Sequence, residues 1–423
     1  GQGALTVAST ADNNTAVGHA ALHLNTTASN NTAVGKDALR NNTTGNFNTA
    51  VGAFALDANT TAVFNTAIGY NALSANTTGQ INIAAGWGAL AINTTGDNNS
   101  AFGTSALANN TTADNNTAVG KDALLANTTG TRNVAVGSIA LDANTTASDN
   151  TAVGYQALGA NTTGVDNTAF GSGALLANTT ASNNTGIGAA ALDSNTTGAQ
   201  NTAVGRETLA ANTTGVYNTA IGFQALDATT TTSFNVAVGS GALGANTESA
   251  QTAVGHNALH NVTTGHSNVA VGTDAGDSVT TGSGNVILGR SADTPSATAD
   301  NQVILGTSSI ANLRCQQQSI DGLSDSRDKT NIIDSIYGLD VINSIRPRQF
   351  TWAMREPSAN DGKTELGFIA QELDESLGEK NDVIRAVDKI NPETLYASYG
   401  RFIPVLVKAV QELSAKVTAL EAA

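Results

Sequence analysis

The chain has 423 residues, a net charge of −15, 43 glycines and one cysteine, and only 13% of its residues are charged. One cysteine excludes a disulfide scaffold and a zinc–thiolate cluster, and five scattered histidines give no metal-site pattern, so we expect neither a metal nor a cofactor. The acidic balance argues against a nucleic-acid partner, no run of about 18 apolar residues predicts membrane insertion, and no signal peptide is visible after Gly1.

A 17-residue repeat fills the first three quarters of the chain. The pentapeptide Asn-Thr-Ala-Val-Gly recurs with small variations, and its glycine falls at positions 18, 35, 52, 69, 86, 103, 120, 137, 154, 171, 188, 205, 222, 239, 255, 272, 289 and 306. All intervals are 17 residues except the 16 from Gly239 to Gly255. The unit is too short for two helices, and turn formers bound its two apolar pieces, Thr-Ala-Val-Gly and Ala-Leu. We therefore predict short strands joined by tight turns, with one coil of a β-roll or β-solenoid per repeat.

Stacked coils of this kind share a core that no single coil could form. We expect one inward ladder from the residue before each glycine, namely Val17, Val34, Val51, Ile68, Ala85, Phe102 and Val119. A second ladder would consist of Leu22, Leu39, Leu56, Leu73, Leu90, Leu107 and Leu124. We interpret the recurring Asn-Thr-Thr as turns with hydrogen-bonded side-chain ladders; the alternative is N-glycosylation at Asn-x-Thr.

Residues 12–306 resemble the head repeats of trimeric bacterial adhesins, which carry small-apolar-Gly strand signatures. The resemblance implies a trimer of left-handed β-rolls. The repeats of those heads are usually shorter, so the winding of this shaft, as separate rolls or as interwound chains, stays open. Those adhesins end in a membrane anchor of amphipathic strands, whereas this chain ends in a predicted helix.

The composition changes near residue 312. Of the 19 Lys and Arg residues, 7 precede residue 324 and 12 follow it, and four of the five prolines lie in the last hundred residues. We predict a solenoid shaft of 18 repeats over residues 1–311, a linker over 312–323 and a small α+β domain over 324–423. The predicted fold class is therefore mostly β, with a homotrimeric shaft and a C-terminal chaperone domain that ends in a coiled-coil helix.

Three ordered motifs mark the last domain: Ser-Asp-x-Arg-x-Lys-x-Asn-Ile from Ser324, Phe-x-Trp from Phe350, and Gly-Phe-Ile-Ala-Gln-Glu from Gly367. Together they resemble the C-terminal intramolecular chaperone auto-processing domain of phage tail spikes and fibres, typified by endosialidases. The resemblance implies a serine peptidase that acts only on itself. Its implied residues are the dyad Ser324 and Lys329, the scissile bond Leu323–Ser324, and the supporting side chains Asp325, Arg327 and Asn331.

The dyad chemistry constrains the local structure. A serine needs a base, and a lysine is a base only when burial lowers its pKa. On spacing alone, Ser324 fits a helix cap and Lys329 a surface charge, and the ordered motif set is what favours the dyad. Residues five apart lie about 140° apart on a helix and on opposite faces of a strand. Either a turn therefore folds the segment back, or Lys329 meets Ser324 of another chain. We also expect Asp325 to cap a helix that begins near Thr330.

The end of the chain has a heptad pattern over about residues 402–422. Its apolar residues are spaced 3, 4, 3, 4 and 3 apart: Ile403, Leu406, Val410, Leu413, Val417 and Leu420. This a/d seam predicts a trimeric coiled coil, and the alternative is an ordinary amphipathic helix. A coil this short is marginal alone, but it could bring three chains together before the slow pairing of the shaft.

These observations lead us to expect a trimeric tail-fibre or spike subunit whose C-terminal domain nucleates trimerisation and is then cut off. Its expected place is a virion tail fibre or an extracellular appendage, and its expected partners are its own copies and a cell-surface receptor or glycan. The alternatives are a bacterial surface adhesin with the same chaperone, a polysaccharide-degrading spike, and an ice- or mineral-binding solenoid. The uniform repeats contain no catalytic insertion, which argues against the spike enzyme.

Overall fold

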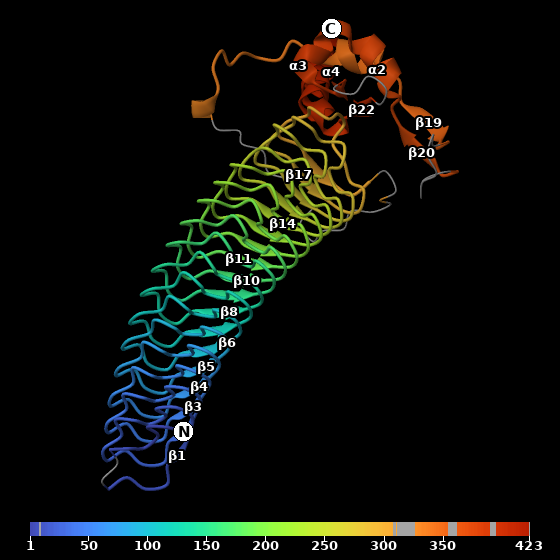
Figure 1. Ribbon diagram of the computed structural model, residues 1–423. Coiled ribbons are helices and arrows are strands. Elements are labelled where there is room, and N and C mark those ends of the chain that lie inside the picture. Colours follow the sequence, from blue (N-terminus) through green and yellow to red (C-terminus); the bar gives the residue numbers. More distant parts are fainter. Residues whose placement is uncertain (8–9, 308–309, 311–325, 354–361, 390–394, 423) are drawn as a thin grey trace. The chain divides into compact units, whose positions relative to one another are not determined.

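The computed structural model describes residues 1–422 except 8–9, 308–309, 311–325, 354–361 and 390–394. It divides into two units: residues 1–292 with 300–304, and residues 293–299 with 305–423. The first unit is the repeat region, and its coils stack into one column (Figure 1).

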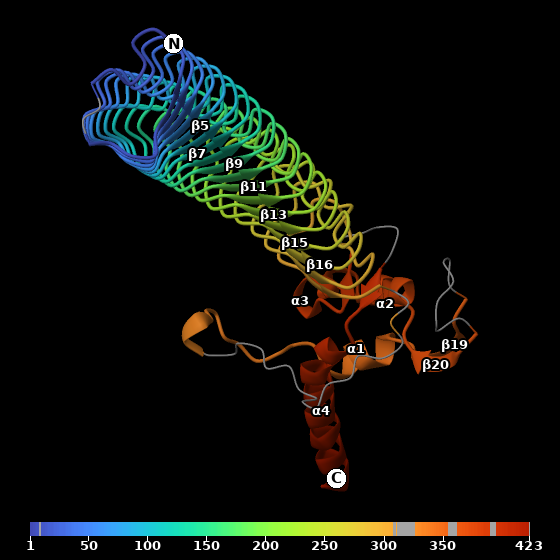
Figure 2. The same ribbon diagram turned by 60° about the horizontal axis from the view of Figure 1, so that its bottom comes forward.

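Each coil of the column contributes one three-residue strand to a single sheet. Strands β1 to β17 pair in parallel, each with the next along the chain, so that Thr15 faces Thr32 and Val17 faces Val34. Figure 2 shows the strands lined up along one wall of the column. The strands are β1 Thr15–Val17, β2 Thr32–Val34, β3 Thr49–Val51, β4 Thr66–Ile68, β5 Ile83–Ala85, β6 Ser100–Phe102, β7 Thr117–Val119, β8 Val134–Val136, β9 Thr151–Val153, β10 Thr168–Phe170, β11 Thr185–Ile187, β12 Thr202–Val204, β13 Thr219–Ile221, β14 Val236–Val238, β15 Thr252–Val254, β16 Val269–Val271, β17 Val286–Leu288 and β18 Val303–Leu305. The predicted solenoid with one coil per repeat is confirmed.

The Ala-Leu piece of the repeat is not a strand, which corrects the expectation of two strands per coil. It lies in a run of turns, because the leucine has a left-handed backbone, as at Leu107 with φ 51°. Its amide still bonds to the next coil, as from Leu107 N–H to the Ala123 carbonyl at 3.0 Å. Stacking bonds therefore continue around the coil without a second sheet.

The core contains the predicted leucine ladder but not the predicted valine ladder. Leu22 and its equivalents are fully buried, together with the residue that precedes each of them, which is alanine except at Thr208. In the strands the middle residue, such as Ala50, is buried, whereas the third residue, such as Val51 in β3 or Phe102 in β6, points outward and is exposed. The prediction of an inward ladder from Val17 to Val119 is therefore wrong, because alternation along the strand turns the small residue inward.

Two columns of buried asparagines hold the turns together. In the Asn-Thr-Thr column, Asn110 Nδ2 donates to Asn93 Oδ1 at 2.8 Å and to the Ala113 carbonyl at 2.9 Å. In the column that precedes each strand, Asn48 Oδ1 accepts from the Asn65 amide at 2.9 Å, one coil further along. The side chains of both columns are buried and their amide groups stack from coil to coil. A buried amide leaves no room for an attached glycan. This confirms the interpretation of Asn-Thr-Thr as hydrogen-bonded ladders.

The 16-residue interval leaves this ladder unbroken. Gln251 replaces asparagine where the preceding turn is one residue shorter. Its amide donates to Asn235 Oδ1 at 3.0 Å, and its own Oε1 accepts from the Asn268 amide at 3.0 Å. The longer side chain therefore compensates for the missing backbone residue.

The second unit contains a small α+β fold. Its elements are the 3₁₀ turn η1 Ser326–Asp328, α1 Leu339–Ser344, β19 Arg348–Thr351, β20 Thr364–Gly367, α2 Ala370–Leu377, η2 Gly378–Lys380, α3 Asn381–Ile384, β21 Val387–Asp388, β22 Tyr396–Ala397, η3 Tyr399–Phe402 and α4 Ile403–Glu421. Strands β19 and β20 pair antiparallel, as do β21 and β22. Buried side chains from α1, α2, α3 and α4, such as Val341, Leu373, Ile384 and Val405, form its core.

Candidate functional site

The predicted dyad falls at the edge of the described residues. Leu323, Ser324 and Asp325 lie outside them, so the scissile bond and the serine remain predictions. The chain after them makes the 3₁₀ turn η1, and the Lys329 amide donates to the Ser326 carbonyl at 3.2 Å. The segment that joins the two dyad positions therefore contains a tight turn rather than a regular helix or strand.

The other residues of this motif lie on the surface of the single chain. Arg327 in η1, Lys329 and Asn331 are all exposed. No helix begins near Thr330, and α1 starts only at Leu339, so that expectation is wrong. The physical reason is the left-handed backbone of Asn331, with φ 54°, which cannot belong to a right-handed helix.

An apolar segment without helix or strand follows the motif. Between Asn331 and α1, the side chains of Ile332, Ile333 and Ile336 are 69%, 83% and 73% exposed. Isoleucine is among the residues most often buried in folded proteins. Next to the predicted cleavage site, the single chain thus presents an apolar surface to water.

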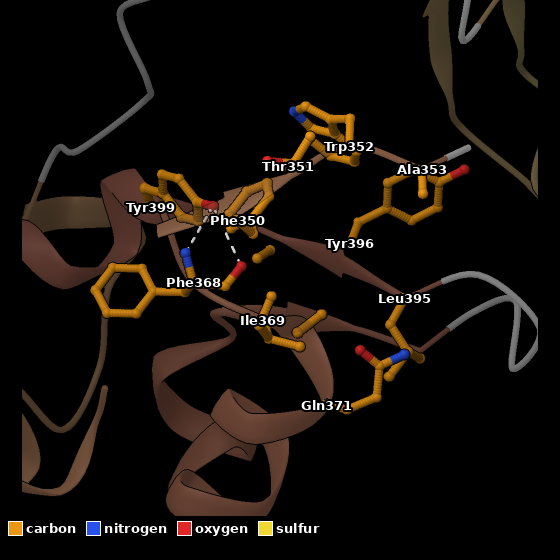
Figure 3. Close-up of a pocket in the computed structure, with 12 residues that line it drawn as sticks. Phe350, Thr351, Trp352, Ala353, Phe368, Ile369, Gln371, Leu395, Tyr396 and Tyr399 are labelled. Carbon is orange, nitrogen blue, oxygen red and sulfur yellow. Dashed lines mark hydrogen bonds between the residues drawn. The ribbon is translucent and has the colours of Figure 1, made fainter. Parts of the chain in front are cut away.

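The other two motifs meet around a hollow of about 450 Å³ (Figure 3). Phe350, Thr351 and Trp352 come from β19 and the residue after it. Phe368 and Ile369 lie between β20 and α2, and Gln371 lies in the first turn of α2. The Tyr399 hydroxyl accepts from the Phe368 amide at 3.0 Å and donates to the Phe368 carbonyl at 3.4 Å, as the two dashed lines of Figure 3 mark. No sequence pattern predicted that Tyr399 would hold the backbone at Phe368, between β20 and α2.

An ion pair ties the same two motifs together. Arg348 Nε and Nη2 donate to the two carboxylate oxygens of Glu372 at 2.8 and 2.9 Å, which joins β19 to α2. The hydrogen bonds from Arg348 lower the pKa of Glu372, and the carboxylate raises the pKa of Arg348. A bidentate pair fixes orientation as well as distance, so these residues position the motifs and are not part of the dyad.

Helix α4 contacts its own domain with one side and leaves the predicted seam uncovered. Val405 and Ala409 are buried in the core, whereas Ile403, Leu406, Val410, Leu413, Val417 and Leu420 are all exposed. Glu412, which precedes Leu413 of the seam, accepts from the Leu339 amide at 2.9 Å and so caps α1. Figure 2 shows α4 projecting from the rest of its unit. The terminal helix and its exposed apolar stripe are observed, and the trimeric seam remains a prediction.

Within the described ranges, no group of three His, Cys, Asp or Glu side chains is arranged to hold a metal ion. The helices of those ranges include none that is long and apolar enough to cross a membrane.

Comparison with known proteins identifies the C-terminal region. Residues 324–381 match the family described as the chaperone of endosialidase. No curated protein and no solved structure matches the chain. A 17-residue β-solenoid followed by such a domain fits a fibre protein with a C-terminal chaperone.

Proposed function

We propose that this protein is a trimeric tail-fibre or spike subunit, and that its C-terminal domain assembles the trimer and then cuts itself off at Leu323–Ser324. In this proposal Ser324 is the nucleophile, Lys329 is its base, and Asp325, Arg327 and Asn331 support them. The observation that carries the proposal is the family match over residues 324–381, which begins at Ser324 itself.

The exposed apolar surfaces of the C-terminal unit support assembly. The α4 seam and the isoleucines at 332, 333 and 336 together place nine large apolar side chains in water, six on the seam and three before α1. Large exposed apolar side chains gathered on one element, as on α4, mark a protein–protein interface. Association through a threefold seam would bury it and would bring three copies of the cleavage segment close together.

The exposure of Lys329 supports a cleavage step that waits for assembly. A lysine base requires burial, and the Lys329 side chain of a single chain is exposed. A neighbouring chain that covers this segment would supply the missing burial. Cleavage would then release only correctly assembled shafts, whose unfolding could not proceed by reversal of their assembly.

The test is intact-mass analysis of the protein after folding, beside Ser324→Ala and Lys329→Arg. Wild type should give a shaft ending at Leu323 and a fragment of 100 residues, 423 minus 323. Both variants should stay full-length, because alanine removes the nucleophile and arginine keeps the charge but cannot accept the proton. Ser326→Ala, two residues away in η1, is the matched control and should be cut like wild type.

A second measurement separates cleavage from assembly. Light scattering of Ser324→Ala should give three times the mass of one chain, because this variant loses only the chemistry. A stable monomer that is cut at the wild-type rate would overturn the proposed order of events. A wild-type trimer that stays uncut would support the proposed chaperone role and contradict the proposed self-cleavage.

The attachment role follows from the shaft that remains. A long, charge-poor column without a membrane-spanning helix among its described residues is suited to presentation of a surface at a distance. The proposed partner is a receptor or glycan of a cell surface. Binding of the purified cleaved shaft to intact bacterial cells, against cells stripped of surface polysaccharide, tests this partner. Loss of glycan fragments into solution would point to a degrading spike instead.

A further inference from the structure

The solenoid has one continuous uncharged face. It consists of the first and third residues of strands β1 to β18, which flank the buried middle residue, and we call it the outer strand face. Its first column is threonine, serine, valine or isoleucine throughout, and none of the residues at either position is charged. The third column is apolar in every coil: Val17, Val34, Val51, Ile68, Ala85, Phe102, Val119, Val136, Val153, Phe170, Ile187, Val204, Ile221, Val238, Val254, Val271, Leu288 and Leu305.

This face lies open in the single chain. Val17 and Phe170 are 56% exposed, and Phe102, Ile68 and Val271 are exposed as well. Single apolar side chains on a surface are ordinary, but an apolar column that recurs coil after coil along a whole sheet is not. Its persistence indicates that the face is covered in the functional protein.

Charges border this face without entering it. Two residues beyond the third column, several coils carry a base, and the next residue is often its acidic partner, as in Lys121 with Asp122 at 3.0 Å. Lys36 and Arg206 have the same arrangement with Asp37 and Glu207. In other coils the same position carries an exposed aromatic side chain, such as Trp87 or Tyr155. The face therefore has an uncharged centre, and charges occur only at its margin, as in many protein interfaces.

The dimensions also fit an interface. Eighteen strands about 4.8 Å apart and three residues wide give a face of about 80 by 10 Å, or about 800 Å². That is about the area that each partner contributes to a standard stable interface. Only a partner whose groups repeat at the same spacing along the axis could match this face over all its coils, and another copy of this chain has that spacing by construction.

We propose that the outer strand faces of the three chains pack against one another along the shaft, with the side chains of the third column at the centre. This inference rests on the proposed trimer and adds which surface of the shaft the copies share. The α4 seam then joins the chains at one end, and the outer strand face joins them over their length. The charged residues two positions further on, Lys36, Lys121, Arg206 and Arg290, stay in water.

Thiol labelling of the full-length protein tests this packing. The background carries Ser324→Ala, which keeps the chain uncut, and Cys315→Ser, which removes its single cysteine. Val119→Cys places a thiol on the outer strand face, and Thr104→Cys places one on the neighbouring exposed column, one coil earlier. Both side chains are exposed in a single chain, so a free column would label them at similar rates.

The expected result is a trimer in which a maleimide modifies Val119→Cys at least tenfold more slowly than Thr104→Cys, with the difference abolished in denaturant. Circular dichroism equal to that of the parent confirms that both variants fold, and Val271→Cys repeats the test nine coils nearer the C-terminus than Val119. A trimer in which both thiols react equally fast overturns this inference but supports the proposed trimer. The same equal rates are expected if the face instead binds ice or another protein. A monomer overturns the proposed trimer and this inference together.

Discussion

Left-handed residues set the shape of every coil. Leu107 is fully buried and has φ 51°, and Ser105 two residues earlier has φ 55°. A left-handed backbone costs a residue other than glycine roughly 1–2 kcal/mol. Full burial of a leucine contributes about 1.5–3 kcal/mol and offsets that cost. The coil thus relies on its core to hold a conformation that local preference disfavours.

The glycine that follows each strand cannot be replaced without a steric clash. Gly103 has φ 135°, and a Cβ added there would lie 2.5 Å from the Gly120 carbonyl oxygen of the next coil. We expect Gly103→Ala to separate two coils and to lower the urea midpoint of the column markedly. Gly88→Ala is the control, because Gly88 also has a positive φ, 64°, but has open space around its Cβ position. Equal urea midpoints for the two variants would show that the loss of stability comes from backbone strain and not from the contact between coils.

The asparagine ladder offers a neighbouring pair for comparison. Asn110 is buried and bonded to both adjacent coils, whereas Asn109 is exposed. Asn110→Ala should lower the free energy of unfolding by about 2–4 kcal/mol, since each buried polar group left without a partner costs about 1–3 kcal/mol. Asn109→Ala should stay within about 0.5 kcal/mol of wild type. Urea titration followed by circular dichroism measures both, and a similar loss in each would argue against the ladder.

At the level of the coil, the sequence period predicted the fold, the leucine ladder and the asparagine turns, but it could not orient the strand. Side chains alternate along Thr-Ala-Val, so either the alanine alone or its two neighbours face inward. Hydrophobicity favours valine inside, which is wrong, because the space inside the coil decides which side chain fits. At Gly186, which replaces the inward alanine, an added Cβ would already lie 3.3 Å from Leu175 Cγ. The large leucine of one coil leaves room for only a methyl group in the next.

One coil shows the opposite arrangement and so provides a test. Gly276 stands where other coils have leucine, and Ile287, eleven residues later, fills the inward position of alanine. A Cβ on Gly276 would meet Ile287 Cδ1 at 2.9 Å. Ala118→Ile should therefore destabilise the column by about 1–3 kcal/mol through overpacking against Leu107.

The double variant Leu107→Gly with Ala118→Ile reproduces the arrangement of that coil. It should recover part of the stability that Ala118→Ile loses, whereas Leu107→Gly alone should be destabilising through its cavity. Thermal unfolding of the three variants gives the coupling between the two positions. Additive losses would mean that the leucine and the strand residue do not compete for the same space.

The acidic column five residues after the coil glycine predicts a pH dependence. Burial raises the pKa of Asp57, Asp142, Asp193 and Asp227. Their charged forms are disfavoured in the folded column, so stability should increase as pH falls from neutral through these raised pKa values. Asp149 affects stability in the opposite direction, because hydrogen bonds from Arg132 lower its pKa. Its ionised form stabilises the folded column, and this stabilisation is lost only in stronger acid.

The melting temperature of the column should therefore be higher at mildly acidic pH than at pH 7, and it should fall again in strong acid. Replacement of the four aspartates by asparagine should flatten the rise without removing the fall. Circular dichroism melts across this range make the comparison. A melting temperature that decreases steadily from neutral pH would contradict the assignment.

For the whole molecule, the ordered motifs predicted the domain but not how its parts meet. Spacing within a motif locates Ser324 and Lys329, whereas the Arg348–Glu372 pair joins residues 24 positions apart and depends on the fold. The cap that Glu412 gives α1 spans 73 positions, and no local sequence pattern predicts it. In a single chain the seam residues and Lys329 are exposed, so in the proposed trimer the complete site would depend on contacts between copies, which the sequence of one chain does not reveal.

The last prediction joins the seam to the chemistry. Val410 lies at the middle of the seam and is 64% exposed, so Val410→Lys would not disturb the single domain but would place three like charges together in a trimer. We expect a large loss of trimer by light scattering and, in the same sample, an equal loss of the 100-residue fragment. Ala415→Lys adds the same charge to the exposed opposite side of α4 and should do neither. If Val410→Lys abolished the trimer while the fragment still appeared at the wild-type rate, each chain would cut itself alone, and the turn at η1 would be what brings Lys329 to Ser324.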